Sequence, residues 1–291
     1  MNQFPTLQIT IRQALTHAIE TLAAAEIDSP RLDAEVLLAH VLHTDRSWLF
    51  AHANRPLSAE QYSQFEELIA RRIKFEPVAF LTGEREFFGL PFFVSPAVLI
   101  PRPETELLVE MALARLPAHA ARVMDIGTGS GCIAVALAVH RPEWRVIATD
   151  ISAAALAIAQ KNIRRHGVSA RVSAVQADLL SAFSGTVDAI VSNPPYVNFR
   201  MLPEISPTVR DFEPHHALFS PDAGLAHVRR LVASAGRLLV SGGLLLVEIG
   251  AEQGEAVLSL AQRLAPEASF SVAHDLAGRD RLLVGEYSHP A

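Results

Sequence analysis

The chain has 291 residues, of which 50% are hydrophobic and 19% are charged, so it can bury the core of one large domain or of two smaller ones. This composition argues against intrinsic disorder, and the formal net charge of −6 gives no support to a broadly basic surface for nucleic acid. The single cysteine, Cys132, rules out an intrachain disulfide and fits a reducing compartment.

The first residues carry no signal-peptide pattern, and the longest apolar runs are of strand length. We therefore expect a cytoplasmic protein without a membrane span. The histidine pairs His40/His43 and His215/His216 have no third ligand at a suitable spacing, so no metal is expected. We also expect a monomer that forms no stable complex with nucleic acid.

Residues 1–82 have a helical pattern. Apolar residues recur at helical spacing from Ile11 to Leu22, and Ser58 and Gln61 have the spacing of a capping box at the start of another helix. We predict a bundle of about three helices that forms a separate domain and recognises the substrate.

Residues 83–101 are rich in aromatic and β-branched side chains, with a break at Gly89-Leu90-Pro91. This pattern predicts a β-hairpin linker. A helix is then expected to begin near Pro103, at the start of a third region, residues 102–291.

From residue 121 onward, strand-like and helical patterns alternate. This alternation predicts a mostly parallel, Rossmann-like α/β sheet of seven strands with helices on both faces. Strand-like runs lie at 122–126, 145–149, 171–176, 187–192, 243–249 and 281–287, and helical stretches at 131–140, 152–166, 222–238 and 251–265.

A glycine-rich loop follows the first of these strands. Gly127, Gly129 and Gly131 allow close backbone approach and positive φ, and the helix that follows presents unpaired N–H groups. Asp150 ends the next strand, 19 residues after Gly131, where an acid can accept hydrogen bonds from ribose hydroxyls. A dinucleotide-binding site also combines a glycine-rich loop with an acid at the end of the next strand, so the loop alone does not identify the ligand.

Two details favour S-adenosylmethionine over a dinucleotide. The glycines are spaced G-x-G-x-G, with Cys132 where the dinucleotide pattern has glycine. Asp125, just before the loop, would repel a pyrophosphate but can pair with the ammonium group of a methionine moiety. A further acid, Asp178, ends the third strand, where an adenine edge would lie.

The segment Asn193-Pro194-Pro195-Tyr196 ends the fourth strand. Two prolines make this loop stiff and leave it without N–H donors, so it offers acceptors: the Asn193 side-chain oxygen and the Pro194 carbonyl. Two convergent acceptors suit an NH2 group and can aim its nitrogen at a sulfonium methyl group. The ring of Tyr196 can pack on a planar amide or base. The pattern predicts methyl transfer to a planar NH2 group by positioning, without a strong base.

The sequences "DIGTGSGCIA", "NPPYV", "VLIPRPETELLVE" and "FEP" resemble those of the HemK-like protein-glutamine N-methyltransferases. The resemblance covers nearly the whole chain. "SPRLDAEVLLAHVL" and the segment around the hairpin are similar to the branch that acts on release factors, not on ribosomal proteins. The resemblance implies methylation of the glutamine side-chain amide in the Gly-Gly-Gln loop of bacterial class I peptide chain release factors, with S-adenosylmethionine as donor and S-adenosylhomocysteine as product.

The resemblance also implies roles for individual residues. Where this chain has Leu179, relatives can carry an aromatic residue, which implies weaker stacking on adenine. Arg102 and Glu104 would line the pocket entrance or fix the linker. The other implied cofactor residues are Asp125, Gly127, Thr128, Gly129, Ser130, Gly131, Asp150, Ile151, Asp178 and Asn193, and the implied substrate residues are Asn193, Pro194, Pro195 and Tyr196, with Asn193, Pro194 and Tyr196 catalytic.

Four alternatives compete with this interpretation. The chain could methylate a ribosomal protein glutamine, or the amino group of adenine in nucleic acid, although it has no basic DNA-reading domain. It could be an adaptor that keeps the fold without catalysis, although the glycines, acids and Asn-Pro-Pro-Tyr are intact. A nicotinamide-dependent dehydrogenase is the most distant alternative.

Overall fold

A computed structural model describes residues 9–288. The chain divides into two compact units. One is formed by the described residues up to Gly83 together with Ser206–Phe212, and the other by Glu84–Ile205 together with the described residues from Glu213 onward. No helix within residues 9–288 is both long and apolar enough to cross a membrane.

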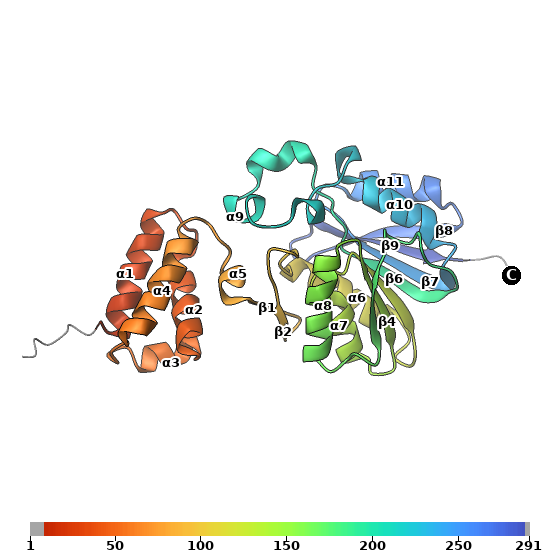
Figure 1. Ribbon diagram of the computed structural model, residues 1–291. Helices are drawn as coiled ribbons and strands as arrows, with labels where there is room; N and C mark the ends of the chain where they lie inside the picture. The colour runs from red at the N-terminus through yellow and green to blue at the C-terminus, as the bar shows by residue number, and fades with distance from the viewer. Residues whose placement is uncertain (1–8, 289–291) are drawn as a thin grey trace, which may run out of the picture. The chain divides into compact units, whose positions relative to one another are not determined.

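The first unit is a helical bundle (Figure 1). The capping boxes are formed: Thr10 with Gln13 begins the first helix, and Ser58 with Gln61 begins the fourth. Five helices replace the three or so that were expected, because the third and fifth are too short to show a clear apolar period. The helices are α1 (Ile11–Ala24), α2 (Pro30–Leu42), α3 (Arg46–Ala51), α4 (Ala59–Arg72) and α5 (Val78–Thr82); α9 (Pro207–Arg210) is assigned to the same unit.

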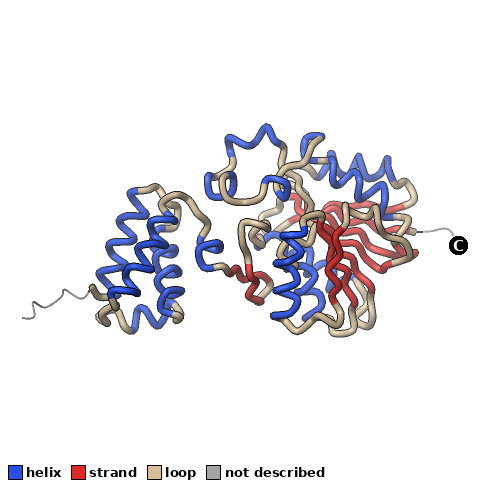
Figure 2. The backbone as a smooth tube through the Cα atoms, viewed as in Figure 1, coloured by secondary structure: helices blue, strands red, loops and turns tan. Residues whose placement is uncertain are grey.

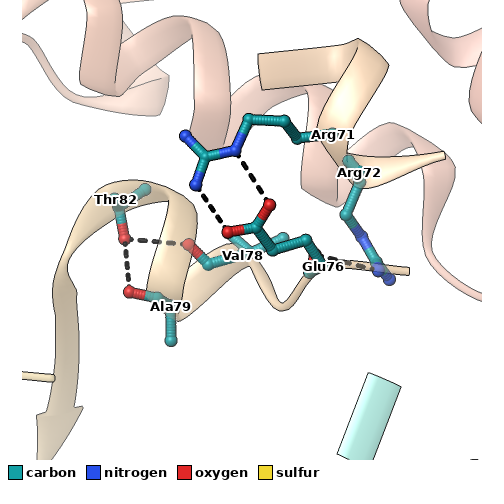
Figure 3. Close-up of polar contacts among 6 residues, drawn as sticks. All are labelled: Arg71, Arg72, Glu76, Val78, Ala79 and Thr82. Atoms are coloured by element: carbon teal, nitrogen blue, oxygen red, sulfur yellow. Dashed lines mark hydrogen bonds and ion pairs between the residues drawn. The ribbon is translucent and has the colours of Figure 1, made fainter. Parts of the chain in front are cut away.

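Two adjacent arginines at the end of α4 both bond to Glu76, through different atoms of that residue (Figure 3). Arg71 pairs with the Glu76 carboxylate through two contacts of 2.8 and 2.5 Å, at a partly exposed position. Arg72 is buried; its Nε lies 2.7 Å from Oδ2 of Asp33 in α2, and its Nη1 donates to the Glu76 carbonyl oxygen. The buried pair therefore ties α4 to α2.

The second unit begins with a hairpin of β1 (Glu84–Phe87) and β2 (Leu90–Phe93), which confirms the hairpin predicted from the sequence. Its two-residue turn, Phe88-Gly89, has φ of +52° and +71°. Positive φ at both central residues matches the twist of paired strands.

The main sheet is drawn in red in Figure 2. It has seven strands in the order β5-β4-β3-β6-β7-β9-β8. The five strands from β5 to β7 are parallel, whereas β9 pairs antiparallel with both β7 and β8. This confirms the Rossmann-like prediction. The strands are β3 (Arg122–Ile126), β4 (Arg145–Asp150), β5 (Val172–Gln176), β6 (Val187–Ser192), β7 (Leu239–Glu248), β8 (Ala268–His274) and β9 (Asp280–Tyr287).

Helices cover both faces of the sheet (Figure 1). Successive strand residues alternate between the two faces: Val123 joins the core under α6, α7 and α8, whereas Met124 joins the core under α10 and α11. The longer helices are α6 (Glu106–Arg115), α7 (Cys132–His140), α8 (Ala153–Arg165), α10 (Ala226–Ala235) and α11 (Gly254–Leu264), and the 3-10 turns are η1 (Pro103–Thr105), η2 (Phe199–Glu204), η3 (His215–Ala217) and η4 (Asp222–Gly224).

Three details differ from the sequence prediction. Strand β8 was missed; as an edge strand it buries little of either face. Strand β7 begins at Leu239, four residues early, because Gly242 and Gly243 continue the strand through an irregular pairing with β6. The helix expected at 222–238 is limited to α10, since residues 222–224 form a separate 3-10 turn.

We predict that Arg72→Met destabilises the helical unit by about 3–5 kcal/mol, because it leaves the buried Asp33 carboxylate without its charged partner. The opening free energy of α2 and α4, measured by hydrogen exchange, reports this loss directly. Arg71→Met is the matched control and should cost less than about 1 kcal/mol, because its ion pair is partly exposed. Equal costs for the two substitutions would contradict this reading of the pair.

Candidate active site

The ends of three neighbouring strands lie side by side at one edge of the main sheet. Ile126 at the end of β3 is paired with Ser192 of β6 on one side and with Thr149 of β4 on the other. The strand order changes direction between β3 and β6, and open α/β sheets place ligands at such a switch point. The glycine loop after β3 and the Asn-Pro-Pro-Tyr loop after β6 therefore start side by side.

The glycine loop needs its glycines for conformation. Gly127, Gly129 and Gly131 have φ of +72°, +55° and +82°, a region that L side chains rarely adopt. At Gly131 an added Cβ would also lie 3.2 Å from the Cα of Ala159 in α8. The loop can thus pack closely against α8 while its backbone faces the edge of the sheet.

Asp150, at the end of β4, holds the glycine loop. Its Oδ2 accepts a hydrogen bond from the Gly129 amide and its Oδ1 accepts one from the Ser152 amide, both at 2.9 Å. Each carboxylate oxygen has a second lone pair, so the group can still accept hydrogen bonds from a ligand.

Asp125, at the end of β3, lies behind the same loop and is fully buried. Its Oδ2 accepts hydrogen bonds from Thr128 Oγ1 at 2.6 Å and from the Ala134 amide at 3.1 Å. Burial raises the pKa of this carboxyl to about 7, against the opposing effect of these two bonds. Its Oδ1 has no hydrogen-bond partner among the described residues.

Asn162 of α8 fixes the loop from the other side, and the sequence analysis missed it. Its Nδ2 donates to the carbonyl oxygens of Ser130, at 2.8 Å, and Phe93, at 3.0 Å, while its Oδ1 accepts from the Phe93 amide. One buried side chain thus joins the hairpin to the glycine loop. The signal was a polar residue on the apolar face of a helix, which needs partners when buried.

A pocket opens at this edge. The predicted site residues that line it are Arg102, Gly127, Thr128, Gly129, Ser130, Asp150, Ile151, Asp178, Leu179, Asn193 and Pro195, together with Val98, Thr105, Ile133, His216 and His227, among others. The predicted residues outside the lining are Asp125 behind the glycine loop, Gly131 at its end, Glu104, and Pro194 and Tyr196 in the Asn193-Pro194-Pro195-Tyr196 loop, called the acceptor loop below.

Asp178 lines this pocket and forms an ion pair with Arg230. Its carboxylate accepts a hydrogen bond from Arg230 of α10 at 2.7 Å, which lowers its pKa, and about half of its side chain is exposed. The next residue, Leu179, has φ of +49°. His227, also from α10, bonds to Ser220 Oγ at 2.8 Å. The pocket is thus lined both by the segment that follows β5, through Asp178, and by α10, through His227.

Arg102 is anchored by a buried acid. Glu213, in the "FEP" segment, accepts a hydrogen bond from Arg102 Nη2 at 2.6 Å and one from the Ile100 amide at 3.1 Å. Burial raises the pKa of Glu213, and the nearby Arg102 opposes this shift. The linker segment before η1 is therefore fastened to the segment that precedes η3.

The acceptor loop is held by two residues that the sequence analysis missed. Asn193 donates from Nδ2 to Thr105 Oγ1 at 3.0 Å, which leaves its Oδ1 for an incoming donor. The Tyr196 hydroxyl donates to Oε1 of Glu248 at 3.2 Å, and burial raises the pKa of Tyr196. Glu248 ends β7 and is almost wholly buried. The signal available in the sequence was a carboxylate at the end of an apolar strand, at the edge of the sheet where ligands bind.

A glycine loop backed by acids, next to a rigid loop of acceptors at the switch point of this sheet, defines a Rossmann-like methyltransferase. A Pyrococcus furiosus methyltransferase crystal structure matches with a TM-score of 0.53 at 17% identity, over 80% of this chain and 100% of that one. Residues 103–203 match the family described as methyltransferase small domain, and residues 13–83 match the one described as PrmC N-terminal domain.

Two curated relatives resemble the whole chain. Both are named release factor glutamine methyltransferase. The protein from Nitratidesulfovibrio vulgaris is 44% identical, covering 97% of each chain, and that from Escherichia coli is 44% identical, covering 94% of this chain and 97% of that one. The chain belongs to the release factor glutamine methyltransferase family. Family and fold imply S-adenosylmethionine as the methyl donor.

We predict that Asp150→Ala weakens S-adenosylmethionine binding by about 10- to 100-fold, the equivalent of losing one hydrogen bond to a charged group. The substitution removes both the tether of the glycine loop and the acceptor that faces the pocket. Isothermal titration calorimetry measures the effect. Asp188→Ala is the control, because Asp188 accepts from the Arg122 amide at the opposite end of the sheet. Unchanged affinity in Asp150→Ala would place the ribose partner elsewhere.

Proposed function

We propose that this protein transfers a methyl group from S-adenosylmethionine to the side-chain amide nitrogen of the glutamine in the Gly-Gly-Gln loop of class I peptide chain release factors. The observation that carries the proposal is the Asn193 side chain. Its NH2 group is engaged by Thr105, so its oxygen is left to accept from an NH2 group in the pocket. The family membership supports the choice of a release factor.

The residues around the glycine loop suit the donor. Asp125 Oδ1 and Ser130 Oγ are buried and have no hydrogen-bond partner among residues 9–288. Such atoms are costly unless a ligand or water satisfies them, which supports a role for both in holding the charged end of a methionine moiety. Ser130 would act from the pocket lining and Asp125 from behind the glycine loop. Asp150 would hold the ribose, Ile151 and Leu179 would flank the base, and Asp178 would accept from the adenine edge.

The bound donor would supply an electrophilic methyl group on a sulfonium centre. The role of the protein's own residues would be to position the substrate NH2 group. Asn193 Oδ1 and the Pro194 carbonyl oxygen would accept the two hydrogens of the substrate NH2 group, since the two prolines keep this loop rigid and free of competing donors. Hydrogen bonds to these acceptors favour the positive charge that develops on nitrogen during transfer. The methylated amide then loses a proton readily to water, because an N-protonated amide is strongly acidic.

We assign recognition of the protein substrate to residues 1–82, with 83–101 as the linker and 102–291 as the part that transfers the methyl group. The support is compositional and structural: the first unit has its own apolar core, and the described pocket is formed by residues of the second unit. A separate folded unit without a share of the chemistry is suited to holding a partner.

The test of the reaction is incorporation of labelled methyl groups into a purified release factor. The protein and labelled S-adenosylmethionine should label the wild-type factor and leave a version with alanine in place of the glutamine unlabelled. Label in both versions, or in neither when donor binding is intact, would refute the proposal. In that case a ribosomal protein and nucleic acid are the next substrates to assay.

We predict that Asn193→Ala lowers kcat by at least about 100-fold, because a misplaced acceptor costs this much when catalysis depends on positioning. The affinity for S-adenosylmethionine should change by less than about threefold, since other residues hold the donor. Asn198→Ala is the matched control; Asn198 only caps η2 by accepting from the Arg200 amide. Near-normal turnover by Asn193→Ala would exclude the acceptor role.

We predict that a chain lacking residues 1–82 loses at least about tenfold in kcat/KM for the intact release factor, because docking contacts contribute binding energy far from the reacting atoms. Its kcat/KM for a short peptide containing Gly-Gly-Gln should stay within about threefold of the full chain. A truncated protein that is equally efficient on both substrates would reject the assignment of recognition to the first unit.

A further inference from the structure

Glu248 has an unusual position for a carboxylate. It ends an apolar strand, only 1% of it is exposed, and it does not line the pocket. Its Oε1 accepts from the Tyr196 hydroxyl, while its Oε2 has no hydrogen-bond partner among the described residues. Burying a carboxylate is costly, so a group retained here calls for a role beyond packing.

Thr105 bonds to the acceptor loop and also interacts with this carboxylate. It is 2% exposed, its Oγ1 accepts from Asn193 Nδ2, and it lies close enough to Glu248 to lower the pKa of that carboxyl. A threonine hydroxyl has one hydrogen to donate. Because its oxygen already accepts from Asn193, that hydrogen is left for donation to the Glu248 carboxylate.

The direction of these hydrogen bonds decides which way the Asn193 amide faces. An ionised carboxylate only accepts, so Thr105 and Tyr196 both donate to it. Thr105 Oγ1 is then an acceptor, which selects the amide orientation with NH2 towards Thr105 and Oδ1 towards the pocket. If Glu248 carried a proton, it could donate to Thr105, and the Thr105 hydroxyl could donate to Asn193. The Asn193 amide would then turn its NH2 group towards the substrate NH2 group, so that two hydrogen-bond donors would face each other.

We propose that Glu248 and Thr105 are positioning residues, forming a relay that fixes Asn193 with its oxygen towards the substrate amide and holds Tyr196 beside it. This relay rests on the proposed function, and it adds a source of specificity. A site whose acceptor orientation is locked discriminates a carboxamide NH2 from groups that cannot donate, such as a carboxylate.

The relay makes turnover depend on pH. Burial raises the pKa of Glu248 to about 7; bonds from Thr105 and Tyr196 and the charge of Arg281 oppose this, and the charge of Glu104 adds to it. The charge of Arg102 also reaches Tyr196. The acceptor-only form therefore accumulates as pH rises through about 7, so kcat should be highest above pH 8 and should fall below pH 6.

The first variant is Glu248→Gln, which keeps the size of the side chain but adds an NH2 group that can donate to Thr105. We expect kcat to fall by about 10- to 100-fold while donor affinity stays within about twofold, because positioning is lost and the donor site is untouched. The fall in kcat below pH 7 should disappear. A Glu248→Gln enzyme with wild-type kcat and pH profile would overturn the proposal, as would a parallel loss of donor affinity and melting temperature, which would mark a structural role.

The second pair of variants isolates the hydroxyl. Thr105→Val removes it without changing the shape, and should lower kcat by about tenfold or more; Thr105→Ser restores it, and should return kcat to within about threefold. Thr149→Val is the matched control, because Thr149 is equally buried and its Oγ1 has no partner in the described part of the chain. Failure of serine to rescue, or an equal loss in Thr149→Val, would contradict the relay.

A measurement that does not depend on methyl transfer can test the relay independently of the proposed substrate. In protein labelled with ¹⁵N-asparagine, the side-chain NH2 signals of Asn193, assigned with Asn193→Ala, should shift with a midpoint near pH 7 and stop shifting in Glu248→Gln. Wild-type protein that shows this shift but leaves the release factor unmethylated would reject the substrate and keep the relay. Signals that do not respond to pH in the wild type would reject the relay whatever the substrate is.

Discussion

The site depends on the parallel pairing of β3 with β6. The register that sets Ile126 opposite Ser192 makes the two loops that follow begin at the same level, one built from glycines and the other from prolines. These loops have opposite chemistry. The glycine loop gives close backbone approach and N–H groups, whereas Asn193-Pro194 gives acceptors alone. A shift of this register by one residue would also exchange the residues that face the two cores, so the core and the site specify the same pairing.

Behind each loop is a buried polar side chain that holds it. Asp125 and Asn162 fix the glycine loop, Glu213 fastens the segment carrying Arg102, and Glu248 supports the acceptor loop. Each of these groups would destabilise the fold if left unpaired, so the loops and their buried partners stabilise one another. Rigidity of this kind is useful where the chemistry consists of positioning, because the orientation of the acceptors is then set before the substrate arrives.

The sequence predicted those features that follow from local pattern. The alternation of strands and helices, the hairpin around Gly89, the capping box at Ser58 and the position of the glycine loop could be read directly. The pattern failed where structure depends on contacts between distant residues. The role of Thr105 arises from Asn193, 88 residues away, and that of Glu248 from Tyr196, 52 residues away. Strand β8 was missed because an edge strand has one neighbour and a weaker apolar pattern.

The most direct test of the central claim is to locate the added methyl group by tandem mass spectrometry. A release factor incubated with this protein and S-adenosylmethionine would be digested, and the peptide containing Gly-Gly-Gln would be fragmented. The account predicts one methyl group on the side-chain nitrogen of that glutamine, added at least about 100-fold more slowly when Asn193→Ala replaces the wild-type protein. A methyl group on another residue, or an unmodified peptide despite measured donor binding, would contradict it.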